Sequence, residues 1–155
     1  FWKINVAKKA KLNFDSYIQA CISMSQSKTG ALIVFMQQNE LNEVIASGET
    51  VVAVVSTALL ETIFFKNTPL HDGAVIVKGN KILAARCILP VSSNLAINPN
   101  LGLRHRSAIG ITEVSDAIAV IVSEQTGAIS YVKEGVITHG VTPVQLKKYL
   151  EGNIL

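Results

Sequence analysis

Two short clusters of polar residues stand out in this chain of 155 residues. The first is Leu70-His71-Asp72-Gly73-Ala74, and the second is Leu103-Arg104-His105-Arg106-Ser107. A carboxylate can accept a proton or hold a metal ion, and guanidinium groups stabilise the negative charge that spreads over a phosphoryl group. If the fold brings the two clusters to one site, they have the chemistry of phosphoryl or nucleotidyl transfer.

Each cluster also has a plainer interpretation. Asp72-Gly73 is a common turn dipeptide, and Arg104-His105-Arg106 is compatible with a solvated basic turn. Yet cationic side chains are unfavourable at a helix N-terminus, where the helix dipole is already positive. Such residues fit there if an anion binds, because side-chain donors and free backbone N–H groups then converge on it. This favours a phosphate site at the start of a helix predicted over residues 104–114.

The composition indicates one domain with a substantial core. Hydrophobic residues make up 49% and charged residues 16% of the chain, which argues against disorder. The net charge of +3 is too small to indicate a nucleic-acid surface, so we expect no nucleic-acid partner. Cys21 and Cys87 lie in apolar patterns and are interpreted as reduced core thiols.

The common nucleotide, zinc and serine-hydrolase motifs are absent from the sequence. It contains no Gly-x-x-x-x-Gly-Lys-Ser/Thr, no Gly-x-Gly-x-x-Gly, no paired-cysteine zinc pattern and no Gly-x-Ser-x-Gly. His139, which precedes Gly140, is interpreted as a turn or surface histidine. The functional prediction therefore depends on the two clusters.

Hydrophobic spacing predicts four or five helices and about five strands. Helices are expected over residues 14–27, from Ser56 or Thr57 to 64, over 104–114 and after Thr142, with a short helix or turn within 37–48. Strands are expected at 31–36, 74–77, 82–89, 117–123 and 128–132, and residues 91–101 form a long loop. Hairpins join several of the strands. The predicted fold class is α/β, a single globular domain with a central mixed β-sheet flanked by helices.

Capping residues mark some of these helix ends. Asn13 or Asp15 is expected to cap the helix over residues 14–27. Thr142 and Gln145 form a capping box with Pro143 at the first helical position, and Gly152 is expected to follow the end of that helix.

The N-terminal residues are basic. Lys3, Lys8, Lys9 and Lys11 follow Phe1-Trp2, a composition that fits either a solvated face or a segment next to an anionic membrane surface. We therefore divide the chain into a basic linker at residues 1–13, expected to follow a membrane anchor, and a domain at residues 14–155.

The two clusters and their flanks resemble a known family. Residues 68–77 (TPLHDGAVIV) and 101–108 (LGLRHRSA) are similar to the paired Asp-Gly-Ala and Arg-His-Arg motifs of the diadenylate cyclase family. The resemblance extends through residues 110–116 and 122–127 and covers roughly residues 14–150. It is nearest to the membrane-anchored type, in which transmembrane helices precede the cyclase domain.

The resemblance implies an enzyme that condenses two ATP molecules into cyclic di-AMP and releases two pyrophosphates. It implies a divalent metal, Mn²⁺ or Mg²⁺ and also Co²⁺, and a homodimer in which two domains, each holding one ATP, meet face to face. It further implies a cytoplasmic domain tethered to the inner face of the cell membrane. The sequence names no regulatory partner.

The resemblance also implies roles for individual residues. Asp72 would lie beside the attacking ribose hydroxyl, Gly73 and Ala74 would let the backbone approach the nucleotide, and Arg104, His105 and Arg106 would bind phosphates. Further nucleotide contacts are implied for Gly102, Leu103, Ser107, Ser123 and Glu124, and for Ile88 and Leu89 at the adenine. The implied metal ligands are His71, Asp72 and Glu124.

Two residues depart from the family pattern. Leu103 stands where many relatives carry Thr, which removes a hydroxyl, and Gln125 stands where many carry a second Glu, which removes an anionic metal ligand. Both bear on metal preference and turnover. Asp72 and both arginines are intact, so we predict an active enzyme. Two alternatives stay open: a catalytically weak nucleotide-binding sensor module, and a metal-dependent phosphohydrolase.

Overall fold

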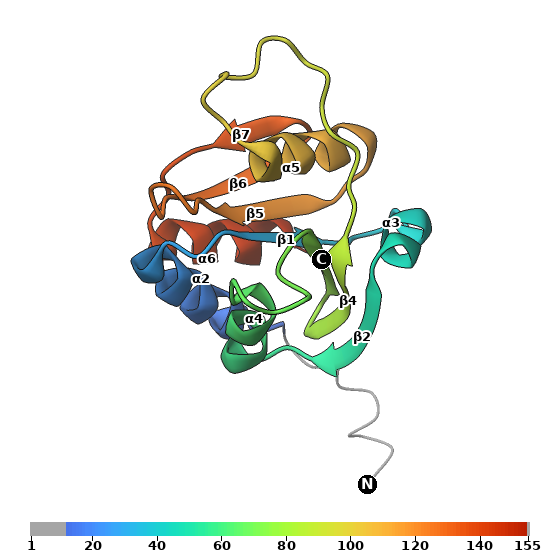
Figure 1. The fold of residues 1–155 in the computed structure, drawn as a ribbon, viewed down its shortest axis with the longest axis vertical. Coiled ribbons are helices and arrows are strands. Elements are labelled where there is room, and N and C mark those ends of the chain that lie inside the picture. Colours follow the sequence, from blue (N-terminus) through green and yellow to red (C-terminus); the bar gives the residue numbers. More distant parts are fainter. Residues whose placement is uncertain (1–11, 155) are drawn as a thin grey trace, which may run out of the picture.

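The computed structural model describes residues 12–154, which fold around one mixed β-sheet (Figure 1). Seven strands pair in the order β2-β4-β3-β1-β5-β6-β7. Their bounds are β1 Ala31–Phe35, β2 Glu49–Val54, β3 Ala74–Lys78, β4 Lys81–Cys87, β5 Ile118–Val122, β6 Ile129–Lys133 and β7 Val136–Thr138. Only β1 and β3 pair in parallel within this sheet.

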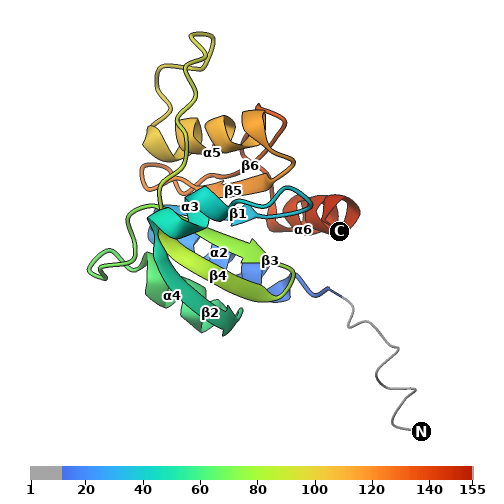
Figure 2. The ribbon, with the colours of Figure 1, turned by 90° about the vertical axis from the view of Figure 1, so that its right-hand side faces the viewer.

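Helices cover both faces of the sheet, so the described chain forms three layers (Figure 2). On one face lie α2 (Asp15–Ser27), α4 (Thr57–Phe64) and α6 (Pro143–Asn153), and on the other lie α3 (Asn42–Ser47) and α5 (Leu103–Val114). This confirms the predicted fold class, an α/β domain with a central mixed sheet flanked by helices.

The central strands are buried on both sides because each face of the sheet has its own core. In β1, Ile33 and Phe35 belong to the core under α2, α4 and α6, whereas Leu32 and Val34 belong to the core under α5. Side chains alternate along a strand, so a strand covered on both faces is apolar at every position. This explains the continuous apolar run that predicted β1.

Two strands were not predicted from the sequence. β2 lies at the sheet edge, where Val52 and Val54 stay exposed, and its hydrophobic residues alternate poorly with polar ones. β7 is only three residues long at the opposite edge. β2 pairs with β4, and β7 pairs with β6. These hydrogen-bonded neighbours hold the two segments as strands, although their local sequences carry no clear strand pattern.

Some predicted boundaries were wrong. Gly152 lies inside α6 rather than after it, since the helix continues to Asn153. The strand predicted over residues 82–89 ends at Cys87, which leaves Ile88 and Leu89 in the following segment. No side chain caps α2, although the Asn13 Oδ1 atom accepts a hydrogen bond from the Asp15 backbone N–H.

Other local predictions were confirmed. Thr142 and Gln145 form the capping box of α6, and Ser56 caps α4 by accepting a hydrogen bond from the Leu59 N–H. Cys21 and Cys87 are free, buried thiols. Between β4 and α5, residues 88–102 form a long segment that projects from the body of the domain (Figures 1 and 2).

The predicted basic linker at residues 1–13 falls largely outside the described residues, as does Leu155 at the end of the predicted domain. Of its last residues, Leu12 packs against the core beneath α2. Within residues 12–154, the helices are too short or too polar for any of them to cross a membrane.

Candidate active site

A large cavity lies at one end of the central strands. The amino ends of β1 and β3 meet the carboxyl ends of β5 and β4 there, as the pairs Ala31–Val122 and Ala74–Cys87 show. The cavity has a volume of about 1070 Å³, at the upper end of the usual range for small-molecule sites. Both polar clusters contribute to its lining.

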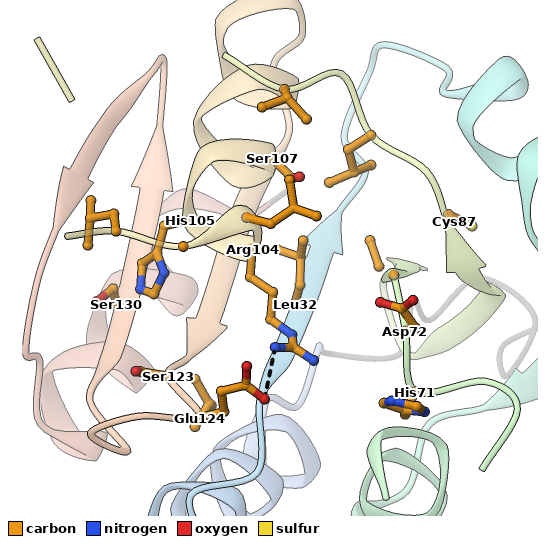
Figure 3. Close-up of a pocket in the computed structure, with 18 of the residues that line it drawn as sticks. Leu32, His71, Asp72, Cys87, Arg104, His105, Ser107, Ser123, Glu124 and Ser130 are labelled. Atoms are coloured by element: carbon orange, nitrogen blue, oxygen red, sulfur yellow. Dashed lines mark ion pairs between the residues drawn. The ribbon is translucent and has the colours of Figure 1, made fainter. Parts of the chain in front are cut away.

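The first cluster forms one wall, just before β3. Gly73 has φ +116°, and a Cβ atom there would lie 2.9 Å from the Arg86 carbonyl carbon and the Cys87 carbonyl oxygen. Only glycine fits this left-handed conformation and close approach without strain. The turn therefore needs Gly73 for its own packing against β4, and it presents Asp72 to the cavity (Figure 3).

Asp72 and His71 present free polar atoms on this wall. The Asp72 carboxylate is exposed, and no residue within 12–154 forms a hydrogen bond or ion pair with it. The Nδ1 atom of His71 lies 2.7 Å from the Thr68 carbonyl oxygen, which can only accept a hydrogen bond. Nδ1 therefore carries the proton, and Nε2 keeps its lone pair for a ligand.

The N-terminus of α5 forms the facing wall. Gly102 is its N-cap residue, no side chain caps the helix, and no acidic residue occupies its first turn. Backbone N–H groups at the start of the helix therefore lack side-chain acceptors. Gly102, Leu103, Arg104 and His105 all line the cavity, so the start of α5 forms part of its wall.

Arg106 does not line the cavity, unlike the other residues of the second cluster. Successive helix residues are rotated by about 100°, so Leu103, Ser107, Arg104 and His105 share one arc and Arg106 lies outside it. Its carbonyl oxygen instead accepts a hydrogen bond of 3.1 Å from the Ser92 N–H. Within one chain, the structure therefore does not bring Arg106 to the site.

Arg104 connects the two parts of the cavity lining. Its Nη1 atom lies 3.6 Å from the Glu124 Oε2 atom, and Figure 3 shows this ion pair between α5 and the turn after β5. The Arg104 side chain is 23% exposed, and its Nε atom is buried without a hydrogen-bond partner in the described chain. Apart from the ion pair with Glu124, the guanidinium has no polar partner among residues 12–154.

His105 lies in a group that the sequence did not predict. Its ring centroid is 6.1 Å from that of His139, whose Nδ1 atom lies 3.4 Å from the Ser130 hydroxyl oxygen. Burial lowers the pKa of His105, and the neighbouring His139 and Arg104 lower it further. His139 is exposed, as expected of a turn histidine, yet it also lines the cavity. Only the pairing of β6 with β5 and β7 brings it there.

The turn after β5 holds Ser123 and Glu124 at the cavity. The Ser123 hydroxyl oxygen lies 3.2 Å from the backbone nitrogens of both Gln125 and Thr126, so it orders the turn. Glu124 is 59% exposed, so its carboxylate is accessible to solvent and to a ligand. The two departures from the family pattern, Leu103 and Gln125, also line the cavity.

The segment after β4 forms an apolar border. The Ile88 side chain is 73% exposed, and its backbone N–H donates to the Ser47 hydroxyl oxygen at 2.9 Å. Leu89 is buried but still lines the cavity. The Ile88 side chain is therefore available to a nucleotide, whereas the Ile88 backbone N–H already donates to Ser47.

Thus all predicted site residues except Arg106 line one cavity. They do not form a ready-made metal site, because residues 12–154 contain no group of three or more His, Cys, Asp or Glu side chains that could hold a metal ion. His71 and Asp72 lie on one wall, while Glu124 is paired with Arg104 on the other.

Comparison with known proteins gives the family. The family model described as DisA bacterial checkpoint controller nucleotide-binding, abbreviated DAC, matches residues 18–137, well over half of the chain. The chain belongs to the diadenylate cyclase family. The residues of both clusters fall inside the matched range, so the family resemblance of the two motifs is confirmed.

Named relatives support the same assignment. The chain is 41% identical over 146 residues to the cyclic di-AMP synthase CdaA of Bacillus subtilis (strain 168), covering 94% of this chain and 54% of that protein. It is 44% identical to a diadenylate cyclase of Listeria monocytogenes serotype 1/2a (strain 10403S), covering 82% and 46%. The diadenylate cyclase domain thus spans about half the length of these curated relatives.

A solved structure confirms the fold. DacA from Staphylococcus aureus, a double mutant, superimposes with a TM-score of 0.88 at 41% identity, covering 90% of this chain and 93% of that one. A protein from Bacillus cereus described as a hypothetical membrane spanning protein gives a TM-score of 0.79 at 42% identity, covering 82% and 62%.

Proposed function

We propose that this domain is a diadenylate cyclase that joins two ATP molecules into cyclic di-AMP and releases two pyrophosphates. The observation that carries the proposal is the cavity in which an unpaired carboxylate, Asp72, faces the cationic helix start at Arg104 and His105. Relatives that carry the names diadenylate cyclase and cyclic di-AMP synthase support it.

The helix start is the phosphate subsite. Free N–H groups and the positive end of the α5 dipole attract an anion, and the Arg104 guanidinium adds charged donors beside them. Because these donors are fixed before the reaction, they stabilise the charge on the α-phosphate without further reorganisation. We assign this contact to Arg104 and His105 and not to Arg106.

Asp72 is the group that serves the nucleophile. The 3′-hydroxyl of one ATP attacks the α-phosphorus of the other, forming a 3′-oxygen–phosphorus bond. The bond from the α-phosphorus to the oxygen bridging to the β-phosphate breaks, and its electron pair leaves with pyrophosphate. Asp72 accepts the hydroxyl proton, as its freedom from hydrogen bonds within residues 12–154 allows. A second identical step closes the ring.

A divalent metal fits this cavity together with the nucleotide. The donors present on one wall are the Asp72 carboxylate and the free Nε2 atom of His71, with Glu124 opposite. Mg²⁺ is commonly bound by one or two carboxylates plus substrate phosphates, and carboxylate ligands also suit Mn²⁺. Imidazole suits divalent iron and nickel, the neighbours of Co²⁺ in the first transition row. The bound ion would neutralise phosphate charge and lower the pKa of the attacking hydroxyl.

The reaction requires two copies of the domain. Each cavity would hold one ATP, and a symmetric product is naturally made across a two-fold axis. Ile88, Val91 and Leu103 line the cavity with side chains that are 51–73% exposed, an apolar surface available to adenine and to a facing protomer. In this dimer, Asp72 serves the ribose of its own ATP and Arg104 holds the phosphate attacked by the other ATP.

We further propose that the full-length protein tethers this domain to the inner face of the cell membrane. The support is the similarity to the Bacillus cereus protein described as membrane spanning. Localisation of the full-length protein in membrane and soluble fractions tests this proposal.

Product analysis tests the enzymatic proposal. The domain is incubated with ATP and Mn²⁺, Mg²⁺ or Co²⁺ in turn, and the nucleotides are identified by chromatography and mass spectrometry. Cyclic di-AMP with two pyrophosphates per product is expected. ATP binding without product would indicate a nucleotide-binding sensor module, and release of inorganic phosphate or a linear nucleotide would indicate a phosphohydrolase.

A further inference from the structure

Gly30 lies directly beneath the Arg104 guanidinium. It is a buried residue immediately before β1, and Figure 3 shows Arg104 extending from α5 toward this strand. A Cβ atom at Gly30 would lie 2.5 Å from Arg104 Nη1, 2.6 Å from Cζ and 3.0 Å from Nη2. The guanidinium therefore occupies the space that a side chain at position 30 would fill.

The backbone conformation does not require glycine at this position. Gly30 is not among the residues with positive φ, whereas Gly73 has φ +116°. Any L-residue can adopt the backbone conformation of Gly30 without the strain of the left-handed region. What the absent side chain provides is room, and Arg104 is the residue that uses it.

Polar contacts alone do not fix the Arg104 guanidinium. Its ion pair with Glu124 spans 3.6 Å, longer than a hydrogen bond between charged groups, and its buried Nε atom has no partner in the described chain. Packing therefore contributes to how deep the guanidinium lies, and Gly30 is one of the residues against which it packs.

We propose that Gly30 is a positioning residue that sets the depth of the Arg104 guanidinium in the phosphate subsite. This inference rests on the proposed function. Alanine at position 30 would push the guanidinium by roughly an ångström toward an ordinary contact distance. Because the displaced group is the end of a flexible side chain, the fold can absorb the change, but a shift of this size at a reacting centre costs about 100-fold in rate.

A double-mutant cycle tests whether Gly30 acts through Arg104. The variants are Gly30→Ala, Arg104→Ala and the double variant. Two quantities are measured for each: the rate of cyclic di-AMP formation, and the affinity for the ATP analogue with a methylene group between its α- and β-phosphates. Gly152→Ala is the matched control, because no atom lies within 4 Å of a Cβ atom there and Gly152 is far from the cavity.

The inference predicts strong coupling in the cycle. Gly30→Ala lowers the rate of cyclic di-AMP formation about 100-fold and weakens binding of the analogue, while its unfolding temperature stays that of the wild type. Gly152→Ala changes neither the rate nor the binding. Added to Arg104→Ala, the alanine at position 30 has no further effect. Losses that multiply in the double variant, or wild-type rate and affinity in Gly30→Ala, would overturn the inference.

Two further outcomes are informative. If Gly30→Ala fails to fold, the double variant should still fold, because it lacks the guanidinium that the new methyl group would meet. A double variant that also fails to fold would show that position 30 contacts something other than Arg104, and this result would refute the inference. If the wild-type domain makes no cyclic di-AMP, the proposed function fails, and the binding arm of the cycle alone decides the role of Gly30.

Discussion

The Nη1 atom of Arg104 and the Oε2 atom of Glu124 form an ion pair of 3.6 Å on one wall of the cavity. Their side chains are 23% and 59% exposed, so solvent screens the pair, and pairs of this kind contribute less than about 1 kcal/mol. A triphosphate competes readily for the same guanidinium. The pair therefore holds Arg104 near the subsite without blocking it.

Replacing Glu124 by Gln should separate the effect of the ion pair on stability from its effect on ATP binding. We expect the free energy of unfolding to change by less than about 1 kcal/mol. In the presence of a metal chelator, ATP should bind more tightly, because a negative charge beside the phosphate subsite has been removed. Calorimetry measures both quantities, and weaker metal-free binding by Glu124→Gln would contradict this role.

Replacing Asp72 by Asn should abolish chemistry while keeping substrate binding. The amide retains the size of the carboxylate but cannot accept the hydroxyl proton, and loss of a general base costs about 10²- to 10⁴-fold in rate. Product formation and ATP affinity are measured on the same preparation. Full activity in this variant would remove the role assigned to the carboxylate.

His105 should make the stability of the domain sensitive to acid. Its pKa in the folded state lies below the ordinary histidine value of 6.5, chiefly because of burial. The folded state then binds fewer protons than the unfolded state. The contribution of His105 to the free energy of unfolding is therefore fully present above the pKa of the unfolded state, and it is lost as the pH falls through the pKa of the folded state. From pH 7.5 to 5, the free energy of unfolding should fall more steeply for the wild type than for His105→Gln. Parallel curves would exclude this effect.

The same histidine should take up a proton when ATP binds. Phosphate charge at the helix start raises the pKa of His105, opposing the lowering by burial, His139 and Arg104. Binding enthalpies measured near neutral pH in two buffers of different ionisation enthalpy give the number of protons taken up. His105→Gln should show a smaller uptake than the wild type, and equal uptake by the two proteins would assign the proton to another group.

Gly110 should be needed for α5 to pack closely against the segment 88–102. A Cβ atom there would collide with the Pro90 carbonyl oxygen and lie 2.9 Å from the Ser92 backbone nitrogen, where the segment 88–102 begins. We expect Gly110→Ala to destabilise the domain by about 1–3 kcal/mol, since backbone cannot give way easily. Gly152→Ala should change stability by less than about 1 kcal/mol, and equal stabilities of the two variants in thermal unfolding would contradict the close packing.

The sequence predicted much of the fold because its signals are local. Continuous apolar runs predicted β1 and β5, and the Thr142–Gln145 capping box predicted the start of α6. β2 was missed because an edge strand with exposed Val52 and Val54 depends on pairing with β4 for its order. Such pairing is a property of the sheet and leaves no periodic signal in six residues.

The site residues that lie in contiguous sequence motifs were predicted well. Those that only the tertiary structure brings to the cavity were not predicted. Asp72 and Arg104 were found from two short clusters, and the cavity contains both. His139 and Ser130 reach it only through the pairing of β6. Gly30 lies next to the Arg104 guanidinium only because of the path that this side chain takes. Arg106 shares its motif with Arg104, but the helical rotation places it away from the cavity.

The central claim is that Asp72 of one protomer and Arg104 of its partner act on the same bond. Mixing the Asp72→Asn and Arg104→Ala variants tests it most directly. In a mixed dimer, one half-site pairs an intact Asp72 with an intact Arg104, so one phosphodiester bond forms and a linear dinucleotide with a 5′-triphosphate accumulates. Neither variant alone should make it. Mass spectrometry that finds this product only in the mixture bears out the shared site, and a mixture as inactive as its components would contradict it.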